Sequence, residues 1–349
     1  MLISQMVYRH NNCLNTKRPY AKSCRLCIDN CPHQAISPFH EIEPKLCTEC
    51  GLCMAICPSD GFVDNYTGEF HYYLESAEEE IVLNCPQAAP LGYEIPCLGI
   101  LDRDLWLYLL LEGKERKVTF FTGKCGECPD KKACAHSVKI FNKIHEEWPE
   151  HPPVSIKVVT EANEELAETY EKTALLVKKI TKSKDEEKKT WREKGWKKLE
   201  KALPGLTSDE AYDIPLSRQL LLKSMDRKHQ EKLPIPALLI NKDCTSCGVC
   251  ASICPQKALT KREKGEELTL IFEPYKCVPN CDRCVNVCSP KAMSFETKNL
   301  PHRHFTGKIL LHKGSPKHCV RCDKLVFDNS EPPLCIACAS SSSDSLFSS

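Results

Sequence analysis

The chain has 349 residues, enough for two or three domains, and a formal net charge of +1 from 48 basic and 47 acidic residues. This balance argues neither for nor against nucleic acid as a partner. The 25 cysteines are the unusual feature. Small secreted proteins reach such densities with disulfides, but they are short and carry a signal peptide.

The first residues, "MLISQMVYRHNNCLNTKRPY", contain no sustained apolar stretch before a cleavage site. The most apolar later segment, "IPCLGILDRDLWLYLLLEG", is interrupted by Asp102, Arg103 and Asp104, so it is a poor membrane span. We therefore expect a cytoplasmic protein without a transmembrane segment, in a reducing compartment where clustered thiols bind metal. Peripheral attachment to a membrane complex is compatible with this expectation.

Four copies of one pattern appear when the chain is aligned with itself on Cys-Pro. In chain order they are "RPYAKSCRLCIDNCPHQAI", "IEPKLCTECGLCMAICPSDGF", "LINKDCTSCGVCASICPQKAL" and "FEPYKCVPNCDRCVNVCSPKAM". The first two lie near the N-terminus and the last two between residues 240 and 295. Each copy predicts a short extended lead-in, a cysteine loop, a short helix and a turn with proline.

The second copy follows C-x2-C-x2-C-x3-C-P without exception, and so does the third. These segments resemble the bacterial ferredoxins that hold two [4Fe–4S] clusters. In such a loop three thiolates wrap one cubane, and the fourth cysteine ligates the other cluster of the pair. The resemblance implies that residues 1–75 form one ferredoxin-type domain with two [4Fe–4S] clusters. Structural zinc is the alternative, but zinc sites usually show two separated C-x2-C pairs.

The ferredoxin rule assigns the N-terminal ligands in two sets. Set B is complete and consists of Cys31, Cys47, Cys50 and Cys53. The partner set has Cys24, Cys27 and Cys57, but Ala21 stands where its first cysteine is expected. Either Cys13 completes this set from eight residues upstream, or the cluster is incomplete and labile. We favour Cys13, and set A is then Cys13, Cys24, Cys27 and Cys57.

Residues 76–160 alternate between short apolar segments and helical patterns, which predicts a small α/β domain. It is rich in cysteine, and its candidate metal ligands are Cys85, Cys97, Cys125, Cys128 and Cys134. Cysteines at the strand ends of an open α/β sheet converge on the crevice where such folds bind ligands.

The order "NCPQ … EIPCLGIL … LLLEGKE … FTGKCGECPDKKAC" resembles the small iron–sulfur subunit that links hydrogenase to heterodisulfide reductase. That resemblance implies one [2Fe–2S] cluster in the central domain. A zinc site that uses four of the five cysteines is one alternative. A redox-active dithiol of Cys125 and Cys128 is another, because nearby lysines would lower a thiol pKa there. These two cysteines are the only catalytic candidates.

Residues 161–232 form a predicted helical, basic linker. Between residues 178 and 201 there are eleven basic and five acidic residues, with Trp191 and Trp196 among the lysines. This pattern invites a nucleic-acid interpretation. We favour a solvated helical arm, or docking to an acidic partner subunit, because charge runs usually lie on solvated faces.

Residues 233–300 contain the third and fourth copies and predict a second two-cluster ferredoxin-type domain. The same rule gives set C as Cys244, Cys247, Cys250 and Cys288. It gives set D as Cys254, Cys277, Cys281 and Cys284. The fourth copy has one extra residue before Cys281 and "CSP" in place of "CP", an insertion that a loop can tolerate.

Residues 301–340 contain two C-x2-C pairs across a twelve-residue spacer, which predicts a zinc-ribbon-like site. We call these four ligands the knuckle set: Cys319, Cys322, Cys335 and Cys338. Zinc is favoured over rubredoxin-like iron, because rubredoxin pairs normally carry glycine after the second cysteine and Asp323 and Ala339 stand there. The serine-rich tail, residues 341–349, is expected to be disordered.

The chain is thus predicted to be a multidomain α+β protein with two ferredoxin-like modules, a small central α/β domain and a zinc ribbon. Neither G-x-G-x-x-G nor G-x-x-x-x-G-K-[ST] occurs. We expect four [4Fe–4S] clusters that relay single electrons within, or to, a larger oxidoreductase complex or redox partner protein. One alternative is a redox enzyme that acts on thiol, disulfide or persulfide substrates at the central cysteines. A weaker alternative is a redox-responsive nucleic-acid-binding protein.

Overall fold

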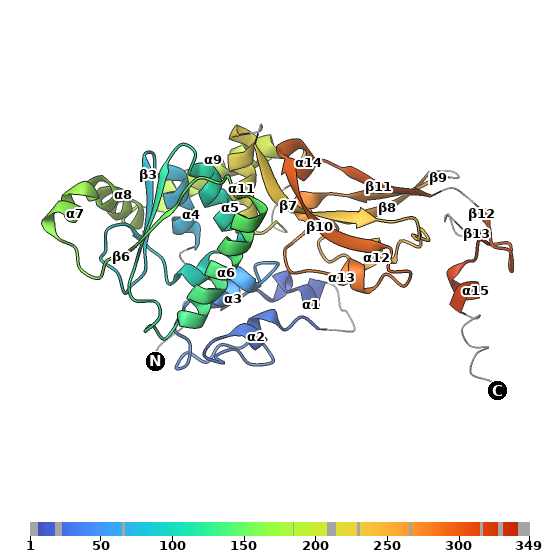
Figure 1. Cartoon of the computed structure of the whole chain (residues 1–349), viewed down its shortest axis with the longest axis horizontal. Helices are drawn as coiled ribbons and strands as arrows, with labels where there is room; N and C mark the ends of the chain where they lie inside the picture. The colour runs from blue at the N-terminus through green and yellow to red at the C-terminus, as the bar shows by residue number, and fades with distance from the viewer. Residues whose placement is uncertain are drawn as a thin grey trace. The chain divides into compact units, whose positions relative to one another are not determined.

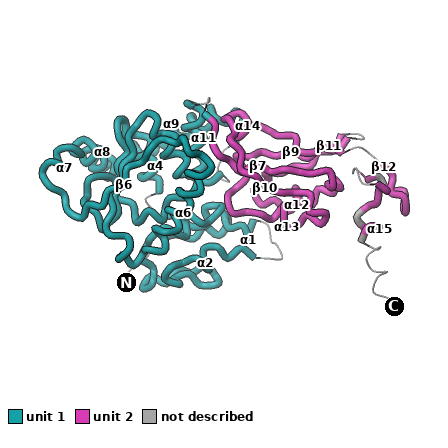
Figure 2. The backbone as a smooth tube through the Cα atoms, in the orientation of Figure 1, with its two compact units in different colours: residues 1–231 teal, residues 232–349 magenta. Residues whose placement is uncertain are grey.

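The structure is a computed structural model of the chain. It describes residues 6–17, 23–64, 67–183, 185–207, 214–228, 231–264, 267–314, 317–326 and 331–340. Ala21 and the predicted disordered tail lie outside the described residues. Helices and sheets are mixed, which agrees with the α+β class (Figure 1). The chain divides into two compact units, residues 1–231 and residues 232–349 (Figure 2).

Unit 1 begins with a small module in which the chain returns to its own start. Its elements are β1 (Met6–Tyr8), η1 (His10–Asn12), α1 (Leu14–Lys17), α2 (Leu26–Asn30), α3 (Leu52–Ile56) and β2 (Phe62–Asp64). β1 pairs with β2 in antiparallel register, Tyr8 opposite Phe62. Because this pairing joins both ends of the module, it brings the segment after β1 close to the segment before β2.

A parallel four-stranded sheet with the order β4-β3-β5-β6 forms the centre of unit 1. Its elements are α4 (Thr67–Ser76), β3 (Glu80–Asn84), β4 (Tyr93–Glu94), η2 (Leu98–Ile100), α5 (Arg103–Glu112), β5 (Lys117–Thr122), α6 (Lys131–Glu147) and β6 (Ser155–Val158). Strands β3 and β5 are buried along almost their whole length, as expected for a parallel sheet covered by helices. Trp106 on α5 is buried and donates to Ser137 Oγ on α6 over 2.9 Å.

The remaining helices of unit 1 follow the sheet. They are α7 (Glu164–Thr169), α8 (Glu171–Thr181), α9 (Asp185–Ala202) and α11 (Leu216–Arg227). The segment predicted as a linker is helical, but α8 packs on α4, α9 on α11 and α11 on α5. Trp191 lies 4.7 Å from Tyr72 between ring centroids, and Lys188 pairs with Glu69 over 2.7 Å. This part of the basic segment therefore packs on the other elements of unit 1 and does not form a free arm.

Unit 2 is built on two antiparallel sheets. Its elements are β7 (Lys232–Ile240), α12 (Val249–Ile253), β8 (Leu259–Lys264), β9 (Glu267–Phe272), η3 (Pro274–Lys276), α13 (Arg283–Asn286), β10 (Met293–Pro301), α14 (His302–Thr306) and β11 (Ile309–Gly314). β7 pairs with β10 over nine residues, and the other sheet has the order β11-β9-β8. As in the N-terminal module, the strand before the first cysteine loop pairs with the strand after the second.

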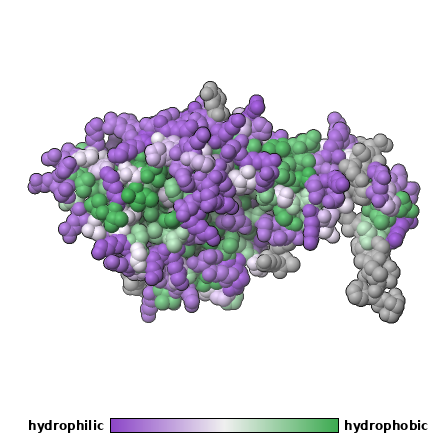
Figure 3. Space-filling view, in the orientation of Figure 1, coloured by the Kyte–Doolittle hydropathy of each residue, from purple (hydrophilic) through white to green (hydrophobic). Residues whose placement is uncertain are grey.

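The knuckle closes the described part of unit 2. It consists of β12 (Lys317–His318), β13 (Leu325–Val326) and α15 (Ile336–Ser340). Figure 3 shows hydrophilic residues over much of the visible face, with separate hydrophobic patches between them. Among the described helices, none combines the length and the apolar composition needed to cross a membrane.

Candidate metal centres

The same backbone turn follows the last cysteine of all four copies. The backbone N–H of the fourth residue after that cysteine donates to its Sγ, over 3.1 to 3.3 Å; the donors are Ala35, Gly61, Ala258 and Ala292. The residue before each donor is left-handed, with φ between 51° and 53°; these residues are Gln34, Asp60, Lys257 and Lys291. Hydrogen bonds to cysteine sulfur are one of the means by which a protein tunes a cluster. The turn is kept in the fourth copy, although its proline comes one residue later.

The structure brings the four thiols of set B together around one cavity. All four cysteines line it, with Met6, Ile36 and Leu52 among the apolar residues of its wall. Burial, followed by the other three thiols of the set, raises the pKa of Cys53 well above its ordinary value. Four cysteines that line one cavity without forming a disulfide are the arrangement that a metal core with several ligand positions requires.

Set A is gathered in the same way, and Cys13 belongs to the group. Burial, followed by the other three thiols of the set, raises the pKa of Cys27 to about 12. A Cβ atom at Gly61 would lie 3.1 Å from Cys57 Sγ and 3.9 Å from Cys13 Cα. Cys13 therefore lies beside the other three thiols of the set. It takes the place of the first cysteine that the ferredoxin spacing expects at residue 21.

Asn15 holds the Cys13 segment against the Cys24 loop. Its Nδ2 donates to the carbonyl of Cys24 over 2.9 Å, and the N–H of Cys24 donates to its Oδ1 over 2.8 Å. Both polar groups of one side chain are thus bonded to one residue of the loop. Cysteine spacing does not point to Asn15; an asparagine two residues after the displaced Cys13 is the only signal for it.

In unit 2 the third and fourth copies form the corresponding groups. Burial, followed by the other three thiols of set C, raises the pKa of Cys250 to about 12. Burial, followed by Cys254 and Cys281 of set D, raises the pKa of Cys284 to about 12. Cys277, the remaining member of set D, packs against the same apolar cluster.

The extra residue in the fourth copy leaves the end of the loop unchanged. Asn280, just before Cys281, is left-handed with φ 60°. Ser246 and Glu49, just before the second cysteines of the regular copies, are left-handed too, with φ 52° and 58°. Asparagine tolerates this conformation better than most residues, so it suits the position.

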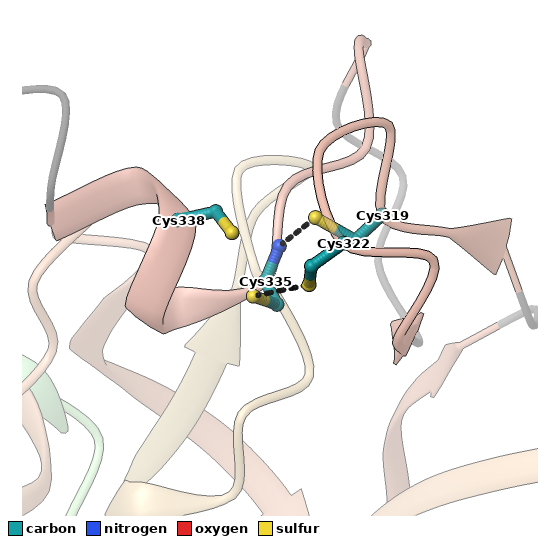
Figure 4. Close-up of side chains that lie close together, drawn as sticks. All are labelled: Cys319, Cys322, Cys335 and Cys338. Atoms are coloured by element: carbon teal, nitrogen blue, oxygen red, sulfur yellow. Dashed lines mark hydrogen bonds between the residues drawn. The ribbon is translucent and has the colours of Figure 1, made fainter.

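The knuckle set differs from sets A to D in being compact (Figure 4). Among the described His, Cys, Asp and Glu residues, it is the only group of three or more whose ligand atoms all lie within 4.8 Å of one another. Cys322 Sγ and Cys335 Sγ are 3.6 Å apart. Tetrahedral zinc with Zn–S bonds of about 2.3 Å separates its sulfur ligands by about 3.8 Å. The knuckle therefore has the dimensions of a mononuclear site.

In the knuckle set, backbone hydrogen bonds lower the pKa values of Cys319 and Cys335, while hydrogen bonds with neighbouring thiols raise the pKa of Cys338. The N–H of Cys335 donates to Cys319 Sγ over 3.3 Å, and this bond is the main reason that the pKa of Cys319 falls to about 6. A thiolate is the form that binds metal. Asp323, where rubredoxin-like pairs carry glycine, is left-handed with φ 57°. The position thus keeps the conformation that glycine favours.

The structure separates the five central cysteines into four and one. Burial, followed by interactions with Cys125, Cys97 and Cys128, raises the pKa of Cys134 to about 12. We call these four residues the central set. Cys85 packs instead in an apolar cluster with Val82, Leu91 and Phe121, and its Sγ accepts a hydrogen bond from Gly123 N over 3.5 Å.

A surface pocket of about 810 Å³ adjoins the central set. Cys125 and Cys134 lie in its wall. Its other lining residues lie mainly on α6 and include Lys131, Lys132, Lys139, Lys143 and Glu146. Because four lysines outnumber one glutamate, the pocket favours anionic groups.

Two segments match known protein families. Residues 243–292 match the family model of the 4Fe-4S dicluster domain. This segment of the chain includes all the cysteines of sets C and D. Residues 40–62 match the family model of the 4Fe-4S binding domain. This segment of the chain includes Cys47, Cys50, Cys53 and Cys57. A comparison with curated proteins gave no match. The chain therefore contains ferredoxin-type 4Fe–4S domains, which indicates iron–sulfur electron transfer.

Proposed function

We propose that the chain is a multi-cluster electron carrier that works as a subunit, or as the dedicated donor, of a larger oxidoreductase. Sets A to D hold four [4Fe–4S] clusters, and the knuckle set holds zinc. The observation that carries the proposal is the fourfold repetition of one ligand geometry: a gathered group of thiols, with an N–H···S turn behind the last cysteine of each copy.

The residues of each set fit a cluster for a simple electrostatic reason. Burial and neighbouring thiols raise the pKa values of Cys27, Cys53, Cys250 and Cys284, so their thiolates are disfavoured without a cation. A metal core supplies the positive charge that holds such thiols deprotonated. Each bound [4Fe–4S] cluster accepts and passes one electron.

The protein supplies the surroundings that such a cofactor needs. Apolar residues pack among the cysteines of both modules; they include Met6, Ile36 and Phe62 in unit 1, and Leu238, Leu268 and Met293 in unit 2. This packing shields the thiols in part from water, since six of the sixteen cysteines of sets A to D are buried and the other ten are half-buried. Burial and N–H···S bonds are the means by which the chain sets a potential.

Metal analysis of anaerobically purified protein tests the proposal. Sets A to D together bind about sixteen iron atoms and as much acid-labile sulfide, since each cubane contains four of each. The knuckle adds about one zinc. Little iron together with several zinc atoms per chain would overturn the electron-transfer function.

Cys13→Ser tests the least regular ligand. Set A then lacks one thiolate, so we expect a loss of up to about four iron atoms per chain, or a [3Fe–4S] signal in the oxidised protein. Sets C and D, which lie in the other unit, retain their iron. Wild-type iron and an unchanged electron paramagnetic resonance (EPR) spectrum in Cys13→Ser would show that Cys13 is not a ligand.

A further inference from the structure

We propose that the central set binds a further iron–sulfur cluster next to set B, so that unit 1 holds three clusters in the order set A, set B, central set. The proposal rests on the proposed function, since it extends the same relay. It concerns Cys97, Cys125, Cys128 and Cys134, which lie outside both segments that match a family.

The central set has the same construction as the ferredoxin sets: three thiols from one segment and one from elsewhere. The segment after β5 turns twice through backbone bonds, from Cys128 N to Cys125 O over 3.3 Å and from Lys131 N to Cys128 O over 3.2 Å. Cys134 then lies in the first turn of α6. The fourth thiol, Cys97, comes from the segment before η2.

Close packing fixes Cys97 against this segment. η2 contacts α6, and a Cβ atom at Gly99 would lie 2.7 Å from Ala133 Cβ. Only glycine permits this approach, so Cys97, two residues earlier, is held beside Cys134. Each of these two cysteines is only 8% exposed. The four thiols therefore come from the segment before η2, the loop after β5 and the first turn of α6.

The central set, as the structure describes it, lacks the compact arrangement of a mononuclear site. Mononuclear zinc requires sulfur atoms about 3.8 Å apart, as in the knuckle set. In the part of the chain that the structure describes, no three ligand atoms of the central set form such a compact group. Sets C and D, whose cysteines are all described and all lie inside the family-matched segment 243–292, likewise contain no such compact group. The central set thus resembles the cluster sites rather than the knuckle.

Asp130 joins the central set to set B. Its Oδ1 is 2.7 Å from His33 Nε2 and accepts a hydrogen bond from Thr48 Oγ1 over 2.6 Å. His33 follows Cys31 of set B by two residues, and Thr48 lies between two further ligands of that set. Asp130 itself precedes α6 and lies between two cysteines of the central set. One carboxylate therefore ties both ligand loops together.

Further contacts give the order of the three sites. A Cβ atom at Gly51, next to Cys50 of set B, would lie 3.1 Å from Ile100 Cβ in η2. Helix α3, which begins directly after Gly51, packs on η2, which directly follows Cys97. On the other side of set B, α3, which carries Cys53, packs on α2, which carries Cys27 of set A. Set B thus lies between set A and the central set.

Iron and sulfide analysis of matched variants tests the proposal. Cys97→Ser and Cys134→Ser should each lose the same two to four iron atoms relative to the wild type, because each removes one ligand of one cluster. Cys85→Ser is the control, since Cys85 lies in the same domain but outside the set, and it should keep wild-type iron. About eighteen or twenty irons in the wild type identify a [2Fe–2S] or a [4Fe–4S] cluster, respectively.

The proposal is overturned if the wild type holds about sixteen irons, or if both serine variants keep all of its iron. This outcome differs from failure of the proposed function, in which sets A to D themselves lack iron. Full iron in sets C and D also shows that unit 2 of a variant has folded, and circular dichroism checks unit 1.

Electron paramagnetic resonance tests the order directly. In the fully reduced wild type, the set B signal should be broadened by spin–spin interaction with the neighbouring central cluster. Cys97→Ser should remove this broadening and Cys85→Ser should retain it. An identical set B signal in all three proteins would contradict the adjacency.

Discussion

At the scale of single residues, Asn15 performs for set A the role that regular spacing performs in the other sets. The chain between Cys13 and Cys24 is longer than a ferredoxin loop, so the position of Cys13 depends on contacts outside the cysteine spacing. The two hydrogen bonds between Asn15 and Cys24 supply such a contact. Each hydrogen bond contributes about 1 kcal/mol to stability. Together the two bonds position one ligand, Cys13.

Asn15→Ala should therefore labilise one cluster and leave the others unchanged. We expect an iron chelator to remove set A iron several-fold faster from the variant than from the wild type, measured by absorbance under anaerobic conditions. Asn30→Ala is the matched control, because Asn30 lies in the same module, is exposed and bonds only to Leu26 O within its own helix. Equal rates in Asn15→Ala and Asn30→Ala would contradict this role.

Asp60 combines a strained backbone position with a buried charge. It is left-handed with φ 51°, its Oδ2 accepts a hydrogen bond from Leu216 N over 2.8 Å, and burial raises its pKa to about 6. In the unfolded chain the pKa is near its ordinary value of about 3.9. The folded state therefore holds the proton more tightly, and the stability of unit 1 falls as the pH rises from about 4 to 6.

Asp60→Asn removes this pH dependence without removing the acceptor. Asparagine tolerates a left-handed backbone and its Oδ1 can accept from Leu216 N. The stability of the variant relative to the wild type should increase by about 1 kcal/mol between pH 5 and pH 7.5, measured by chemical denaturation. The exposed Asp29→Asn serves as the control and should show no such trend. A constant difference at both pH values would refute the argument.

At the scale of elements, the sequence predicts best what depends on a few consecutive residues. The cysteine loops, the short helices after them and the turn after the last cysteine are local, and the 4Fe–4S segments could be read from spacing alone. The position of Cys13 could not, because it depends on the pairing of β1 with β2, more than fifty residues apart in the chain. Pairing between distant strands leaves no signal in a single short motif.

In the central domain, too, local features can be predicted from the sequence and contacts between distant residues cannot. Its strands and helices follow from apolar periodicity, and the sheet is parallel as alternating strands and helices predict. The position of Cys97 beside Cys134 depends on the close approach of Gly99 to Ala133, which lies on another element. Similarly, a basic segment appears solvated in sequence, while Trp191 and Lys188 face α4 in the fold.

The knuckle should depend strongly on the zinc proposed for it, because its own core is small. β12 and β13 pair over only two residues each, and its buried residues are few: Cys319, Val326 and Cys335. So small an apolar cluster cannot order a chain without a metal. Cys338→Ser should therefore lose about one zinc per chain and gain protease sensitivity within residues 301–340, while its iron content stays at the wild-type value. Loss of iron without loss of zinc would indicate an iron site in the knuckle.

At the scale of the whole molecule, the ligand sets respect the division of the chain. Sets A and B and the central set lie in unit 1, and sets C and D and the knuckle set lie in unit 2. None of them takes ligands from both units. Each unit can therefore assemble its own centres, and a defect in one need not empty the other. The serine variants of unit 1 can accordingly be read against the iron of unit 2 as an internal standard.

In the proposed electron carrier, we expect unit 1 to exchange electrons at the face where lysines lie beside the central set. Lys139 and Lys143 line the pocket that Cys125 and Cys134 reach, so an anionic reagent is attracted to this face. Replacing both lysines by glutamate should slow oxidation of the reduced protein by anionic Fe(III)–EDTA several-fold and accelerate oxidation by cationic hexaamminecobalt(III). Stopped-flow absorbance measures both rates, and both effects should shrink with added salt. The same charge change at Lys178 and Lys179, which end α8 outside the pocket, is the matched control. If both double variants behave alike, net charge rather than this pocket governs the rates, and electrons leave unit 1 elsewhere.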